Sequence, residues 1–196
     1  MDGQPVRSIC IFCGSSPGSS PVYAEAARRL VRRLVEQGAS LVYGGSRIGL
    51  MNVVAETALQ AGGRIVGVIP KSLVDREIAH RGLSELHVTD GISERKRLME
   101  ELADAFVALP GGFGTFEELA EVLSWAQLGL HDKPCGLLNT GGFYDPLVAL
   151  FDRAVEAGFL RSASRSLALV DAEPEALAER LLSAPRKRFD RWGPEP

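Results

Sequence analysis

The sequence has little of what several classes of protein require. Its 196 residues include three cysteines, an odd number that does not fit a disulfide framework and is typical of reduced thiols in a cytosol. No apolar run reaches the roughly 18 residues that a membrane-spanning helix needs. Lys and Arg number 22 against 25 Asp and Glu, so the chain lacks the basic excess of a nucleic-acid-binding surface. We therefore expect neither nucleic-acid nor membrane partners.

Two further absences narrow the expectation. Residues 1–5 are polar and contain no charged segment followed by an apolar core, so we expect no secretory signal and a cytoplasmic location. The three histidines are scattered, with no Cys or carboxylate at ligand spacing, so we expect no metal site. At roughly 150 residues per domain, the length predicts one domain, over residues 1–184. Residues 185–196 are then a loosely docked C-terminal tail.

Short apolar runs alternate with longer amphipathic stretches along the chain. The apolar runs are nearly continuous, as in strands that are covered on both faces. They predict strands over residues 8–13, 40–43, 64–69, 85–88, 105–109, 134–138 and 167–170. The amphipathic stretches predict helices over residues 22–37, 50–61, 93–102, 115–128, 146–157 and 174–183. This alternation predicts a doubly wound α/β fold, with a mostly parallel sheet flanked by helices.

Glycine-rich turns follow three of the predicted strands, at residues 14–18, 44–49 and 110–115. In a parallel sheet these turns share the edge where ligands bind, beyond the carboxyl ends of the strands. Backbone N–H groups at such turns and at helix N-termini favour anions. The sequence therefore predicts a nucleotide or another anionic ligand at this edge. The expected contacts include Gly14, Ser15, Gly44 and Gly45.

The sequence matches several well-known functional motifs only in part. The turn at 44–49 has the spacing of a P-loop but lacks the Lys-Ser/Thr pair, and Glu117 occupies the third glycine position of a dinucleotide-binding fingerprint. A nucleophile elbow needs a backbone N–H after its serine, where this chain has Pro17. Cys10 and Cys13 have redox-dithiol spacing but lie in a predicted strand, where they would point to opposite faces. We interpret them as core cysteines.

Two polar segments remain as candidates for chemistry. Arg95, Lys96 and Arg97 open a predicted helix, where cations oppose the helix dipole. This placement beside the binding edge favours a ligand-binding role for Arg95 and Lys96, whereas Arg97 fits a solvated surface. In the second segment, Thr115 and Glu118 have the spacing of a capping box. The spacing alone leaves capping and catalysis equally open for Glu118.

Together these segments closely resemble the paired signatures of the LOG ("lonely guy") family, the cytokinin riboside 5′-monophosphate phosphoribohydrolases. The signatures are Arg95-Lys96 and the PGGxGTxxE motif at residues 110–118, and the similarity extends over nearly the whole chain. The resemblance implies a Rossmann-like homodimer that hydrolyses the N-glycosidic bond of N6-modified AMP, and of AMP. The products would be the free base and ribose 5-phosphate, and no cofactor would be needed.

The resemblance also implies roles for individual residues. Arg95 and Glu118 would be the catalytic pair, and the phosphate would be held by backbone N–H groups of residues 111–115 and by the Thr115 hydroxyl. The residues implied to contact substrate are Glu77, Arg95, Lys96, Gly111, Gly112, Phe113, Gly114, Thr115, Phe116, Glu117 and Ser124. Ile92-Ser93 replaces the Met-His pair that is common in the family, which leaves the preferred N6 substituent open.

Two alternatives to hydrolysis stay open at this point. Molybdenum-cofactor carrier proteins share the fold and a similar glycine loop but hydrolyse nothing. A lysine decarboxylase label is also attached to this family, and that reaction needs a lysine that forms a Schiff base with pyridoxal phosphate. The available lysines are Lys71, Lys96, Lys133 and Lys187, of which only Lys96 is expected at the binding edge.

Overall fold

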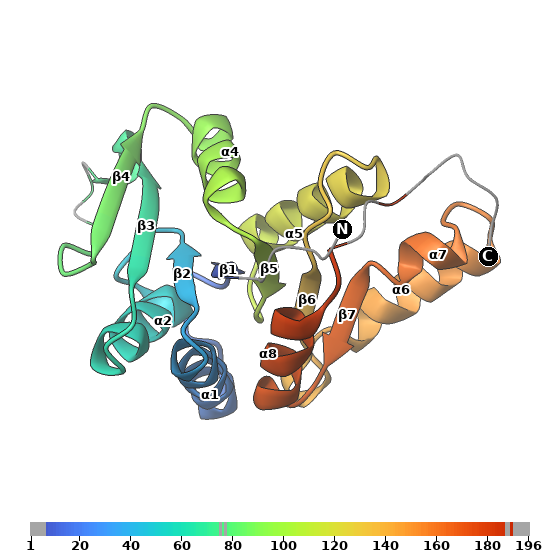
Figure 1. Cartoon of the computed structure of the whole chain (residues 1–196), viewed down its shortest axis with the longest axis horizontal. Helices are drawn as coiled ribbons and strands as arrows, with labels where there is room; N and C mark the ends of the chain where they lie inside the picture. Colours follow the sequence, from blue (N-terminus) through green and yellow to red (C-terminus); the bar gives the residue numbers. More distant parts are fainter. Residues whose placement is uncertain (1–6, 75, 77, 187–188, 190–196) are drawn as a thin grey trace.

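The computed structural model describes residues 7–74, 76, 78–186 and 189. Within these residues, strands form one parallel sheet in the order β4-β3-β2-β1-β5-β6-β7 (Figure 1). The strands are β1 (Ser8–Phe12), β2 (Ser40–Tyr43), β3 (Ile65–Pro70), β4 (Glu85–Thr89), β5 (Ala105–Ala108), β6 (Cys135–Leu138) and β7 (Ala168–Asp171). β3, β5 and β6 are buried throughout, and β1 and β2 are buried except at their first residues, which explains their nearly continuous apolar sequences.

Helices cover both faces of the sheet, as the sequence predicts. They are α1 (Pro21–Glu36), α2 (Gly49–Gln60), α3 (Lys71–Val74), α4 (Ile92–Leu102), α5 (Phe113–Gln127), α6 (Asp145–Glu156), α7 (Ser162–Arg165) and α8 (Pro174–Ser183), with a 3-10 turn η1 (Thr140–Gly142). Leu30 of α1, Val54 of α2 and Leu177 of α8 share one core. Met99 of α4 and Leu119 of α5 belong to a second core on the other face. The doubly wound α/β prediction is confirmed.

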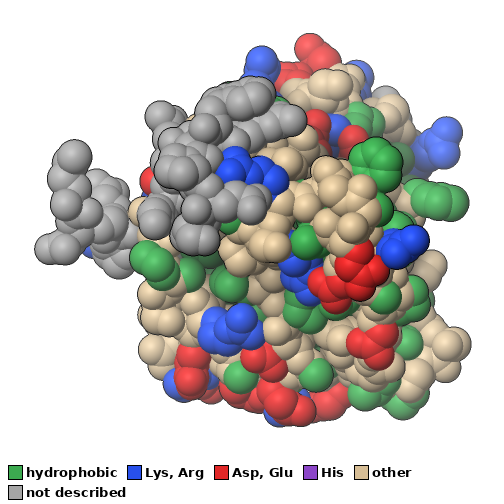
Figure 2. Space-filling view, turned by 90° about the vertical axis from the view of Figure 1, so that its right-hand side faces the viewer, with side chains coloured by type: hydrophobic (Ala, Val, Ile, Leu, Met, Phe, Trp, Pro, Cys, Tyr) green, Lys and Arg blue, Asp and Glu red, His purple; other side chains and the backbone are tan. Residues whose placement is uncertain are grey.

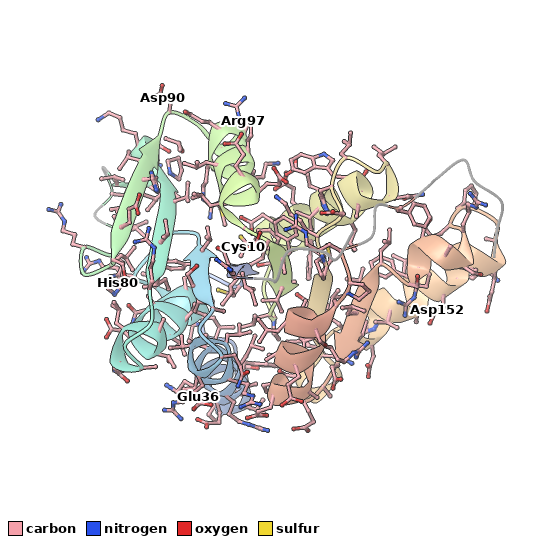
Figure 3. The ribbon with its side chains drawn as sticks, viewed as in Figure 1. Cys10, Glu36, His80, Asp90, Arg97 and Asp152 are labelled. Carbon is pink, nitrogen blue, oxygen red and sulfur yellow. The ribbon has the colours of Figure 1, made fainter. Side chains whose placement is uncertain are left out.

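The cysteines belong to these cores. Cys13 packs with α1 and α2, whereas Cys10 packs with α4 and α5, so the two side chains lie on opposite faces as predicted. Figure 3 shows Cys10 in the middle of the sheet. Cys10, Cys13 and Cys135 are free and buried, and burial raises the pKa of each thiol above its ordinary value. A buried thiol held neutral in this way is a poor redox group.

Helices α5 and α4, which flank the predicted ligand edge, begin earlier than the sequence predicts. Helix α5 begins at Phe113, with Gly112 as its N-cap and no side-chain cap, so the capping box of Thr115 and Glu118 is wrong. The backbone at Gly112 is extended, which lets the helix begin directly after the glycine turn and places Glu118 in the helix interior. Helix α4 begins at Ile92, which places the cations of residues 95–97 beyond the first three helical residues. Their cost against the helix dipole is correspondingly small.

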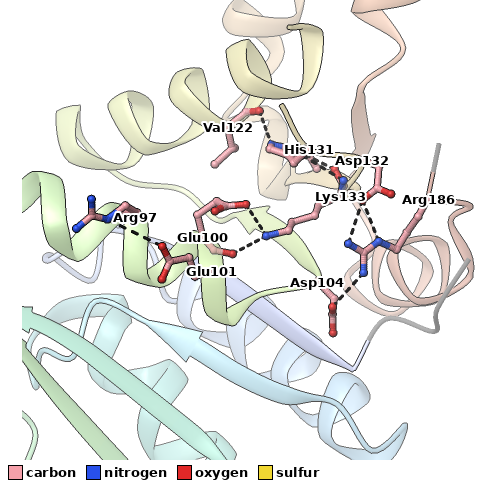
Figure 4. A network of polar contacts seen from close by, with 10 residues as sticks. Arg97, Glu100, Glu101, Asp104, Val122, His131, Asp132, Lys133 and Arg186 are labelled. Carbon is pink, nitrogen blue, oxygen red and sulfur yellow. Dashed lines mark hydrogen bonds and ion pairs between the residues drawn. The ribbon is translucent and has the colours of Figure 1, made fainter. Parts of the chain in front are cut away.

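Two ion pairs fix the start of the predicted tail to the domain. Arg186 Nη1 donates to Asp104 Oδ1 (3.1 Å), and Arg186 Nη2 donates to Asp132 Oδ1 (3.0 Å; Figure 4). Residues 187–188 and 190–196 lie outside the described residues, so the boundary between residues 184 and 185 stays a prediction. No helix among the described residues has the length and apolar character needed to span a bilayer.

Candidate functional site

The candidate site lies where the strand order reverses. The chain runs outward from β1 through β2 and β3 to β4, then returns to the other side of β1 as β5. The turns that follow β1 and β5 therefore diverge and leave a crevice at the carboxyl edge of the sheet. Gly14 N–H donates to Pro110 O (3.1 Å), and Leu50 N–H donates to Gly14 O (3.0 Å). These bonds bring the three glycine-rich turns together, as the sequence predicts.

A cleft of about 420 Å³ opens at this point, within the size range of small-molecule sites. The three turns, the end of β1, helices α2, α4 and α5, and the connection between β3 and β4 supply its walls. Of the predicted site residues, the structure brings together Gly14, Ser15, Gly44, Arg95, Gly112, Phe113, Gly114, Thr115 and Glu118.

One end of the cleft is suited to an anion. Residues 113–115 form the first turn of α5, and their N–H groups have no helical acceptor four residues earlier, so they can donate to a ligand. Gly111 allows the turn to close: a Cβ atom there would lie 2.7 Å from Thr115 Cβ and 2.9 Å from Gly14 N. The Thr115 side chain is buried beneath the turn. Backbone donors with the positive end of a helix dipole make a phosphate cradle.

A buried ion pair lies next to this cradle. Arg95 Nη1 donates to Glu118 Oε1 (3.0 Å), and Arg95 Nε donates to Val68 O (2.9 Å). The Arg95 and Glu118 side chains are only 14% and 10% exposed. Gly44 leaves the space for this arrangement, because a Cβ atom there would overlap the Arg95 guanidinium and lie 2.9 Å from Met51 Sδ.

The environment of Glu118 alters its acidity. Burial raises the pKa of the Glu118 carboxyl above its ordinary value, and the Arg95 guanidinium only partly offsets this effect. Carboxyl groups perturbed in this way, in a cleft and beside a charged partner, are typical of catalytic positions. Arg95 keeps its proton at any physiological pH. The pair therefore places one carboxylate, of raised proton affinity, at the edge of a phosphate cradle.

Lys96 and Glu117 lie beside the cleft rather than in its lining. Lys96 Nζ donates to Glu117 and to Glu121 Oε1 (3.0 Å). Burial by itself lowers the pKa of Lys96, but these two carboxylates outweigh burial and raise the pKa above its ordinary value. Lys96 is therefore a fixed ammonium group that links α4 to α5. Arg97, as expected of a solvated residue, is 70% exposed.

Several predicted site residues are not among those that line the cleft. Phe116 and Ser124 line a separate apolar groove between α5 and α6. Gly45 is in the left-handed region (φ +71°), and its carbonyl accepts the N–H of His80 instead of facing the cleft. Gly111 borders a neighbouring hollow that shares Gly14 and Ser15 with the cleft. Glu77 lies outside the described residues.

The structure adds cleft residues that sequence reasoning missed. They are mostly apolar: Ile11, Phe12, Cys13, Ser46, Ile48, Met51, Leu73, Ile78 and Met99. Met99 could have been found, because it lies four residues after Arg95 and so on the same face of α4. Leu73 and Ile78 belong to the connection between β3 and β4, where no helical or strand period marks which side chains point inward.

Comparison with known proteins adds an independent line of evidence. A family model described as "Possible lysine decarboxylase" matches residues 51–181. The chain is 48% identical over 161 residues to the cytokinin riboside 5′-monophosphate phosphoribohydrolase LOG2 of Arabidopsis thaliana, covering 82% of this chain and 76% of that protein. It is 50% identical over 161 residues to the cytokinin riboside 5′-monophosphate phosphoribohydrolase LOG of Oryza sativa subsp. japonica, covering 82% and 66%. Among solved structures, the molybdenum cofactor carrier protein of Chlamydomonas reinhardtii has a TM-score of 0.67 at 26% identity, covering 90% of this chain and 98% of that one.

Proposed function

The chain belongs to the family of cytokinin riboside 5′-monophosphate phosphoribohydrolases, and we propose that it hydrolyses the N-glycosidic bond of N6-modified AMP, and of AMP. The products are the free base and ribose 5-phosphate. The observation that carries this proposal is the position of Glu118, a buried carboxylate paired with Arg95 at the edge of a phosphate cradle.

Substrate would bind with its phosphate at the first turn of α5. Glu118 lies about one helical turn beyond residues 113–115 on the same helix. A nucleotide whose 5′-phosphate accepts hydrogen bonds from those N–H groups would therefore extend its ribose across the Glu118 carboxylate. The apolar side chains of Met51, Ile78 and Met99 would then flank the base.

The chemistry follows from the charge that develops as the bond breaks. Departure of the base leaves positive charge on the ribose ring, as in other glycoside hydrolyses. The Glu118 carboxylate stabilises this charge and orients or deprotonates the attacking water. The water oxygen bonds to C1′ as the bond from C1′ to the base breaks, and the proton that the water loses to Glu118 passes to the departing base. Arg95 does not supply that proton, because guanidinium remains protonated. It positions Glu118 and draws negative charge from the departing purine.

The two alternatives, a molybdenum-cofactor carrier and a lysine decarboxylase, account for fewer features of the site. The buried carboxylate–guanidinium pair favours hydrolysis over a carrier role, and the sequence identity to the hydrolases is higher, at 48–50% against 26% for the molybdenum cofactor carrier protein. A decarboxylase needs a lysine that can lose its proton in the cleft. Lys96 is held as an ammonium ion by two carboxylates. Lys133 precedes β6, at the edge of the sheet opposite the cleft, and donates to Glu100 O (2.6 Å; Figure 4).

We also propose that the protein is a cytoplasmic homodimer that associates through the α5–α6 face. The apolar groove there has a volume of about 320 Å³, and Phe159 and Leu150 nearby are 88% and 61% exposed. Figure 2 views the molecule from the end that carries α6 and α7, where hydrophobic side chains are scattered among charged ones. Dimerisation would bury Phe116 and Ser124 at the interface. Sedimentation equilibrium tests this: a dimer is expected, and a monomer at micromolar concentration would contradict it.

A product assay tests the proposed reaction. The protein is incubated with AMP, with N6-isopentenyl-AMP and with the matching nucleosides that lack phosphate, and free base is separated by chromatography. We expect base and ribose 5-phosphate from the nucleotides and little from the nucleosides, because the cradle has no phosphate to hold. Tight nucleotide binding without release of base would support a carrier instead.

A further inference from the structure

One wall of the cleft comes from the connection between β3 and β4, to which the mechanism assigns no role. Ile78 lines the cleft, whereas the next residues, Ala79 and His80, line an outer hollow of about 590 Å³. The strip formed by residues 78–80 therefore separates the substrate cleft from this outer hollow. A shift of the strip toward either side would change the width of the cleft.

The backbone of this strip is tied to the glycine turn after β2. Arg47 N–H donates to Ile78 O (2.9 Å), and His80 N–H donates to Gly45 O (2.9 Å). Ser46 and Ala79 form an isolated antiparallel bridge between the two segments. These contacts involve main-chain atoms, so they place no demand on the side chain at position 80.

The His80 side chain adds a second attachment. The side chain is only 9% exposed, and Figure 3 shows His80 near α2. Gly82 N–H donates to His80 Nδ1 (3.2 Å), so Nδ1 is the acceptor and the ring proton is on Nε2. Nε2 then donates to Glu56 Oε1 (3.0 Å) on α2. Both ring nitrogens thus form hydrogen bonds: Nδ1 accepts from Gly82, which follows the strip in the chain, and Nε2 joins the strip to Glu56 of α2.

We propose that His80 is a positioning residue for substrate binding: its bond to Glu56 fixes Ile78 in the wall of the cleft. The inference rests on the proposed function, because it assigns the wall to a nucleotide site. Arg95 and Glu118 lie on α4 and α5 and do not contact His80, so the reacting groups keep their geometry when the bond is lost. The effect therefore falls on substrate affinity and not on turnover.

The test compares KM and kcat for AMP among matched variants. In His80→Ala, KM is expected to rise about tenfold with kcat within about twofold, the pattern of lost uniform binding. His80→Gln keeps a donor for Glu56 and should recover part of the affinity. The double variant His80→Ala/Glu56→Ala should be no worse than His80→Ala alone. His87→Ala is the control, because His87 Nε2 lies 2.7 Å from Glu85 Oε1 but His87 does not line the cleft.

Two further measurements separate the possible failures. Glu56→Ala changes a half-exposed carboxylate and should raise KM even if His80→Ala does not fold. Calorimetric titration with AMP reports affinity without turnover. If the wild type binds AMP but releases no base, the proposed hydrolysis fails while the dissociation constants still test His80. If Glu56→Ala and His80→Ala bind AMP as tightly as His87→Ala does, the positioning role is wrong.

Discussion

The close approach of Arg95 to Gly44 allows a quantitative prediction for the substitution Gly44→Ala. In Gly44→Ala the new Cβ would overlap the Arg95 guanidinium, so the guanidinium must move. That movement weakens the bond to Glu118 or the bond to Val68 O, both of which are charge-assisted. Loss of one such bond costs about 1.5–3 kcal/mol, which corresponds to a decrease of roughly 10- to 150-fold in kcat/KM if the bond acts in the transition state.

Stability should fall together with activity in this variant, because the weakened bond also stabilises the folded protein. Arg95 and Met51 meet the new methyl group with the flexible ends of their side chains, and Gly44 itself does not have a positive φ. We therefore expect no cost beyond that of the weakened bond: a decrease of about 1.5–3 kcal/mol in the free energy of unfolding, or roughly 3–12 °C in Tm. Gly91→Ala is the matched control, because a Cβ there meets open space at the N-cap of the helix that carries Arg95. Wild-type kcat/KM in Gly44→Ala, or an equal loss in Gly91→Ala, would refute this reasoning.

Two other predictions follow from the same groups. Because burial raises the pKa of Glu118 and the carboxylate is the active form, kcat/KM should fall as the pH is lowered, with a midpoint above the ordinary carboxyl value of 4.5. A pH–rate profile with its midpoint at or below 4.5 would contradict the assignment of Glu118. Tyr144→Phe removes the buried hydroxyl that donates to Leu109 O (2.7 Å) and leaves that carbonyl without this partner. Unfolding should become easier by about 1–3 kcal/mol, and denaturant melts that match the wild type would show that the bond contributes nothing.

Most of the fold could be predicted because burial leaves a clear pattern. The expected strand at 40–43 and helix at 174–183 match β2 and α8 at both ends. The short elements α3, α7 and η1 were missed, since three or four residues show no helical period. The predicted helix at 115–128 starts two residues after the first residue of α5, Phe113. Spacing alone cannot distinguish a capping box from a helix that starts at the glycine turn.

The candidate site could be predicted only in part. The glycine turns and the placement of Arg95 and Glu118 beside them follow from the parallel sheet that the alternating pattern predicts, because the carboxyl ends of parallel strands meet at one edge. The wall that contains Ile78 depends instead on long-range bonds such as His80 N–H to Gly45 O, which no local pattern marks. Phe116 and Ser124 were expected at the substrate, but α5 turns them toward α6. A sequence motif therefore identifies the segment of chain near the site, but the orientation of the helix determines which of its side chains line the cleft.

Turnover of AMP by Glu118→Gln tests the central claim most directly. Glutamine keeps the size of the side chain and an oxygen that can accept from Arg95, but it removes the negative charge that would stabilise the cationic ribose. The account predicts that release of adenine falls by at least about 100-fold, in line with the loss of an electrostatic stabiliser, while AMP still binds and Tm stays near that of the wild type. A Glu118→Gln protein that releases adenine at the wild-type rate would contradict the account.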